Sequence, residues 1–188
     1  MGAADFNTGA VIKGTQEEIV AALNVFNTYA TTKHEQYAKE RNCAYLMSCY
    51  LSYEGEHGLG TRLSNMTEED IVKFIAEHNN EVLVSASGPY GRFGFLSEVN
   101  LFKEAAEAAP NATIAGGMSG FNPGGDQIAA FKLENGLLTC KYYEGEPEWE
   151  GEDEDEVWDD DDFDEENFEE PEWDYEEIYD PVTKKIVK

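Results

Sequence analysis

The glycine-rich stretches are the first parts of the chain whose residue types could support phosphate binding or catalysis. Residues 87–95, SGPYGRFGF, precede a helical pattern, a context in which backbone N–H groups can bind phosphate. The stretch matches neither glycine pattern of nucleotide-binding loops, and Arg92 is its single cation. Residues 116–126, GGMSGFNPGGD, read as a glycine-bearing hairpin, and Ser119 is not part of the GxSxG pattern of hydrolases. We therefore predict no catalytic residues and interpret the chain as a protein that is not an enzyme.

The cysteines and histidines lack the spacing of a metal site. They lie far apart along the chain, and no two cysteines form a CxxC pair. The residues are Cys43, Cys49, Cys140, His34, His57 and His78. We predict buried, reduced thiols, as in cytosolic proteins, and we expect neither a metal nor a cofactor.

Residues 144–180 carry most of the charge of the chain. The formal net charge is −27, and this stretch holds 23 acidic residues and no Lys or Arg. Residues 1–143 carry a net charge of only −7. Such a distribution argues against direct binding of nucleic acid or an acidic membrane, because phosphate contacts need clustered Lys and Arg. It favours a basic partner surface that is reached by electrostatic steering.

Aromatic side chains are threaded through the same acidic stretch. Trp158, Phe163, Phe168 and Trp173 recur every five residues, a step that rotates by about 140° on a helix and gives no continuous stripe. An extended chain suits the spacing better and carries one charge per roughly 5 Å, closer to a single strand of nucleic acid than to a duplex. The candidate partner-binding residues are Trp149, Trp158, Asp159, Asp160, Asp161, Asp162, Phe163, Phe168, Trp173 and Tyr175.

The first 143 residues contain the elements of a compact α+β domain. Strands are predicted at residues 9–15, 43–53, 82–87, 112–121, 127–133 and 137–143, and a loop at residues 54–65. One helix begins after Thr15 and runs to about residue 41, another begins after Thr67, and a third covers residues 97–109. Thr15 with Glu18 and Thr67 with Asp70 have the spacing of capping boxes. We expect a mostly antiparallel sheet with helices on one face, in a ferredoxin-like split βαβ arrangement.

The chain is thus divided into residues 1–143, the acidic aromatic-rich C-terminal tail at residues 144–180, and a short basic end at residues 181–188. All helices and most strands precede residue 144, so we expect the first domain to fold alone. The ending EEIYDPVTKKIVK predicts a strand, a turn around Asp180 and Pro181, and a second strand, the pattern of a hairpin.

This profile resembles the acidic nucleic-acid-mimic inhibitors of phages and mobile elements, of the anti-CRISPR and anti-restriction type. The resemblance lies in the size of the chain, its compact α+β domain and the aromatic-laced acidic run. It implies an inhibitor that blocks the basic nucleic-acid channel of a target such as a CRISPR effector nuclease in the cytoplasm. Two alternatives stay open: an acidic adaptor or chaperone for a basic protein, and a small-ligand-binding or enzymatic domain with an incidental solubilising tail.

Overall fold

The computed structural model describes residues 5–29, 48–54, 60–89, 95–122, 125–144 and 172–188, and these form an α+β fold. One sheet of nine strands has the order β3-β2-β4-β1-β5-β6-β7-β8-β9. Every neighbouring pair of strands in it is antiparallel, which confirms the predicted sheet type.

The elements have the following bounds. The strands are β1 (Asp5–Lys13), β2 (Ser48–Ser52), β3 (Thr61–Arg62), β4 (Glu81–Pro89), β5 (Thr113–Asn122), β6 (Gly125–Glu134), β7 (Leu137–Glu144), β8 (Tyr175–Asp180) and β9 (Lys185–Ile186). The helices are α1 (Gln16–Thr28), α3 (Glu68–Glu77) and α4 (Phe95–Ala108), with a short 3-10 helix, η2 (Leu63–Asn65).

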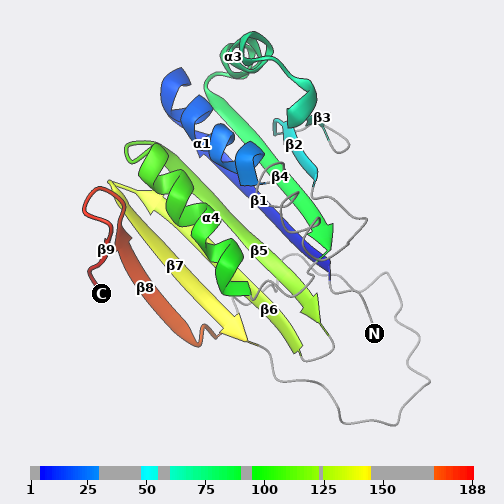
Figure 1. Ribbon diagram of the computed structural model, residues 1–188. Coiled ribbons are helices and arrows are strands. Elements are labelled where there is room, and N and C mark those ends of the chain that lie inside the picture. Colours follow the sequence, from blue (N-terminus) through cyan, green and yellow to red (C-terminus); the bar gives the residue numbers. More distant parts are fainter. Residues whose placement is uncertain (1–4, 30–47, 55–59, 90–94, 123–124, 145–171) are drawn as a thin grey trace, which may run out of the picture.

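Helices α1 and α4 lie side by side across one face of the sheet (Figure 1). The core forms between this helical layer and the sheet, and Phe102 of α4 is almost fully buried in it. The Phe102 ring stacks on Phe131 of β6 at 4.0 Å between centroids and meets Phe26 of α1 edge to face at 5.8 Å. Aromatic contacts therefore join α4 to the sheet and α1 to α4.

Two helical connections each cross over one intervening strand. Strands β1 and β2 are both antiparallel to β4, which lies between them, so β1 and β2 run parallel. Strands β4 and β5 are both antiparallel to β1, which lies between them, so β4 and β5 also run parallel. The strands β6 to β9 then extend the sheet beyond β5 as a meander.

Two glycines of β5 allow its neighbouring strands, β1 and β6, to approach closely. A Cβ atom added to Gly116 would lie 2.2 Å from the Gly9 carbonyl oxygen and 2.7 Å from the Ala10 Cα. A Cβ atom on Gly117 would lie 2.8 Å from the Ala129 carbonyl oxygen in β6. The glycine-rich stretch thus serves the packing of central strands as well as a hairpin.

Both predicted capping boxes are present. The Glu18 amide donates to the Thr15 Oγ1 at 3.3 Å, and the Thr15 amide donates to Glu18 Oε2 at 3.0 Å. The Thr15 amide lowers the pKa of the Glu18 carboxyl, since it stabilises the carboxylate. The box of Thr67 and Asp70 has the same arrangement at the start of α3.

Replacement of Thr15 by alanine is expected to lower the free energy of unfolding by about 1 kcal/mol, because an N-terminal amide of α1 loses its acceptor. Thr15→Ser keeps the hydroxyl and should stay close to the parent. Urea unfolding monitored by circular dichroism measures both variants. Equal losses in the two variants would contradict a capping role for the hydroxyl.

Several element boundaries differ from the sequence prediction. The region predicted as a loop at residues 54–65 contains the short strand β3 and helix η2, because Thr61 and Arg62 pair with β2. Residues 30–47 lie outside the described part, so the predicted continuation of the first helix is not tested there. The predicted C-terminal strand–turn–strand is confirmed by β8 and β9. No helix within the described ranges is long and apolar enough to span a membrane.

Candidate partner-binding site at strand β8

Strand β8 belongs to the acidic stretch in sequence and to the sheet in space. It pairs with β7 in one register, in which Cys140 lies opposite Glu177 and Tyr142 opposite Tyr175. The Asp174 amide also donates to the Tyr142 carbonyl at 2.9 Å. The sheet therefore positions the last part of the predicted binding segment. The expectation that residues 1–143 fold alone stays a prediction.

The side of β8 that faces α4 carries a buried carboxylate. Glu177 is only 5% exposed. Its Oε1 forms an ion pair with Lys103 of α4 and accepts a hydrogen bond from the Tyr142 hydroxyl at 3.3 Å. Burial raises the pKa of the Tyr142 hydroxyl, which therefore remains a neutral donor.

A second charged group lies one turn further along α4. Glu107 accepts a hydrogen bond from the Tyr179 hydroxyl at 2.5 Å and pairs with Lys184 in the turn before β9. The pKa of Glu107 is lowered overall: burial alone would raise the pKa, but the hydrogen bonds from Lys184 and Tyr179 outweigh burial. Burial together with the Glu107 contact raises the pKa of Tyr179 to about 12. The network attaches β8 and β9 to α4.

Aromatic groups near the start of β8 form a partly exposed surface. Tyr175 is 54% exposed and stacks on Tyr142 with ring centroids 5.8 Å apart. The ammonium group of Lys141 lies 5.8 Å from the centroid of the half-buried Trp173 ring. The indole N–H of Trp173 is buried and has no hydrogen-bond partner among the described residues. Because side chains alternate along β7, Tyr142 lies on the side of the sheet that faces α4 and Lys141 lies on the opposite side. We call Trp173, Tyr175, Lys141 and Tyr142, which together span both faces of the sheet at the start of β8, the β8 aromatic surface.

Acidic residues alternate in sequence with the two aromatic residues that the acidic stretch contributes to the β8 aromatic surface. Glu172, Asp174 and Glu176 are exposed beside its two aromatic residues from the acidic stretch. Glu176 lies opposite Lys141 in the β7–β8 ladder and pairs with Lys188 at 3.1 Å. Aromatic rings bordered by carboxylates suit a basic protein surface that also offers apolar pockets.

The structure thus describes two of the ten predicted site residues, Trp173 and Tyr175. The other eight lie outside the described residues: Trp149, Trp158, Asp159, Asp160, Asp161, Asp162, Phe163 and Phe168. Sequence reasoning missed Lys141 and Tyr142, which β7 places beside them. Their positions depend on the pairing of β7 with β8, for which no local sequence signal exists.

The described cysteines are buried and free, which confirms this part of the prediction for Cys49 and Cys140. Burial raises the pKa of Cys49 to about 12 and that of Cys140 to about 11. Both are therefore unreactive thiols at neutral pH. Within the described ranges, no three His, Cys, Asp or Glu side chains are grouped to hold a metal ion.

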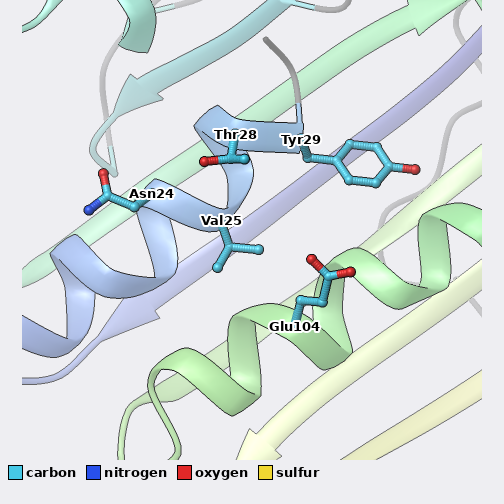
Figure 2. Close-up of a pocket in the computed structure, with 5 residues that line it drawn as sticks. All are labelled: Asn24, Val25, Thr28, Tyr29 and Glu104. Carbon is cyan, nitrogen blue, oxygen red and sulfur yellow. The ribbon is translucent and has the colours of Figure 1, made fainter. Parts of the chain in front are cut away.

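A shallow hollow lies between α1 and α4. Figure 2 shows Val25 and Glu104 pointing toward each other from the two helices, with Asn24, Thr28 and Tyr29 completing the lining. Its volume is about 200 Å³. Pockets for small molecules usually have volumes of about 300–1,000 Å³. The hollow is thus a weaker candidate for function than the β8 aromatic surface.

The comparisons with known proteins give no match: no family model, no curated protein and no solved structure is significantly similar to this chain. Function must therefore be inferred from the site itself.

Proposed function

We propose that the protein is a non-enzymatic inhibitor that binds a basic protein surface and occupies the nucleic-acid channel of its target. A CRISPR effector nuclease is the type of target that we favour, and the cytoplasm is the proposed location. The supporting observation is the β8 aromatic surface, which lies at the end of an intensely acidic stretch. Residues 145–171 contain 17 acidic residues and no Lys or Arg.

The positions of β7 and β8 support a defined presentation of the acidic stretch. Because these strands are neighbours, the chain leaves the sheet after Glu144 and returns to it at β8 on the same side of the fold. Both ends are therefore anchored, and charge can steer the molecule to a basic channel while aromatic groups supply short-range contacts.

The finer description of the fold belongs to the same proposal. The strand order β2-β4-β1-β5 and its two helical crossovers support a ferredoxin-like core to which β6 to β9 are added. In this arrangement α1 and α4 cover one face, and the acidic stretch is attached far from β1, at the β7–β8 side of the sheet.

DNA binding and cleavage by a panel of CRISPR effector nucleases and restriction endonucleases test the proposal. We expect the protein to block DNA binding by at least one nuclease stoichiometrically, and excess DNA to compete. The protein alone should not shift DNA or RNA at micromolar concentration in about 0.15 M salt, because its charge repels phosphate.

A direct shift of nucleic acid would contradict the proposal. Binding to many basic proteins without selective inhibition would favour the alternative of an adaptor or chaperone. Absence of both inhibition and binding across the panel would favour a solubilising role for the acidic stretch, with a small ligand bound elsewhere.

A further inference from the structure

The connection between β7 and β8 is too long to determine how these strands align. In a tight hairpin the turn fixes the register of the two strands. Here 30 residues separate Glu144 from Tyr175, although neighbouring strands are only about 4.8 Å apart. No tight turn therefore sets the register of this pair, so interactions of the strands themselves must select it.

The alternation of side chains along β8 does not distinguish the alternatives. Tyr175, Glu177 and Tyr179 alternate along the side that faces α4, and in the observed register Glu177 lies opposite Cys140. A shift by two residues in either direction keeps every side chain on its own face. Such a shift would place Tyr175 or Tyr179, instead of Glu177, opposite Cys140.

The charged groups do distinguish the alternatives. A shifted strand would leave the Lys103 ammonium group, which is 20% exposed, without its carboxylate. It would also move Glu177 to a position opposite Leu138 or Tyr142. A charge that is buried and separated from its partner is strongly unfavourable, whereas a paired one is tolerated.

We propose that the ion pair between Lys103 and Glu177 sets the register of β8 on β7. The hydrogen bond from Tyr142 to Glu177 also favours the observed register. Glu107 binds Tyr179 and Lys184 only when β8 and β9 occupy their observed places. Buried polar pairs are known to select one alignment among several in coiled coils. The ion pair would set the register in the same way whatever partner the protein binds.

Cross-strand disulfides in the full chain can report the register. Thr139 and Ile178 are opposite each other on the face away from α4, so Thr139→Cys with Ile178→Cys reports the observed register. Thr139→Cys with Glu176→Cys or Asp180→Cys reports the two shifted ones. The background carries Cys43→Ser, Cys49→Ala and Cys140→Ala, so that native thiols do not compete.

We expect the parent to form mainly the 139–178 disulfide under mild oxidation. Lys103→Met with Glu177→Leu replaces the pair by apolar groups, which proteins often tolerate without loss of stability. In this variant the ratio of the 139–178 disulfide to the shifted disulfides should fall about tenfold, because only the contacts of Glu107 with Tyr179 and Lys184 still favour the observed register. Lys73→Met with Glu77→Leu, which removes an exposed pair of α3, should leave the ratio unchanged.

An unchanged ratio in the folded Lys103→Met, Glu177→Leu variant would overturn the proposal. If that variant does not fold, Glu177→Gln decides, because it keeps the size and the acceptor for Tyr142 and removes only the charge. The ratio should then fall about threefold, as expected for partial loss of a charged hydrogen bond. A ratio equal to that of the parent would show that the register is set elsewhere.

Discussion

Replacement of Glu177 by alanine is expected to lower the free energy of unfolding by about 3 kcal/mol, because it leaves a mostly buried ammonium group without its partner. The Tyr142 hydroxyl also loses its acceptor in this variant. Lys103 retains 20% side-chain exposure, so part of its charge can still reach water, which keeps the loss at the lower end for a broken buried pair. Guanidinium unfolding of the full chain measures the effect.

The matched control is Glu134→Ala, which breaks an ion pair with Lys132 whose side chains are 60% and 53% exposed. Exposed pairs contribute about 0–1 kcal/mol, so this variant should stay close to the parent. Similar losses in the Glu177 and Glu134 variants would show that burial of the first pair has no energetic consequence. Lys103→Met with Glu177→Leu should recover most of the stability lost in Glu177→Ala.

The variants of Lys103 and Glu177 can thus separate the effect of this contact on stability from its effect on the register of β8. An apolar pair between α4 and β8 can hold the strand against the helix, but it has no preference for one residue of β8 over its neighbour two positions away. Only the carboxylate matches the position of Lys103. The same contact therefore explains why a charged pair occurs in an otherwise apolar layer that includes Cys140 and Leu138.

The sequence predicts the locally determined parts of this fold. Thr15 with Glu18 and Thr67 with Asp70 mark helix starts because each box lies within one turn of helix. The final hairpin is predictable because Asp180 accepts hydrogen bonds from the two amides that follow Pro181, at 2.9 and 3.1 Å. These signals need only neighbouring residues.

The pairing of β8 with β7 could not be predicted in this way. Glu177 belongs to an acidic run, and carboxylates in such runs are normally solvated. Its burial depends on Lys103, which precedes it by 74 residues, and on Tyr142 across the ladder. The same limit applies to the candidate site. Trp173 and Tyr175 can be identified from the sequence as aromatic candidates, but their contacts with Lys141 and Tyr142 arise only from the fold.

The largest effect on binding is expected from the aromatic residues of the acidic stretch. Trp158→Ser, Phe163→Ser and Phe168→Ser together keep the net charge and should weaken binding to an inhibited nuclease by at least about 30-fold. One aromatic anchor in a desolvated pocket commonly contributes about 2 kcal/mol or more, which alone accounts for such a loss. Trp173 is left in place because it packs against Lys141 in the folded part of the chain. Binding kinetics across a salt series measure the affinity and both rate constants.

A control variant that removes three charges and keeps the aromatic rings separates mimicry from simple attraction between opposite charges. Asp160→Asn, Asp162→Asn and Glu165→Gln also change three residues of the stretch but keep every aromatic ring. Single charges at the rim of an interface act mainly on the association rate, so this variant should associate more slowly and depend less on salt, with only a small change in dissociation. Thermal unfolding of both variants should match the parent. If the serine variant binds as tightly as the parent, the stretch acts as a general polyanion, and an adaptor or solubilising role accounts for it better than occupation of a nucleic-acid channel.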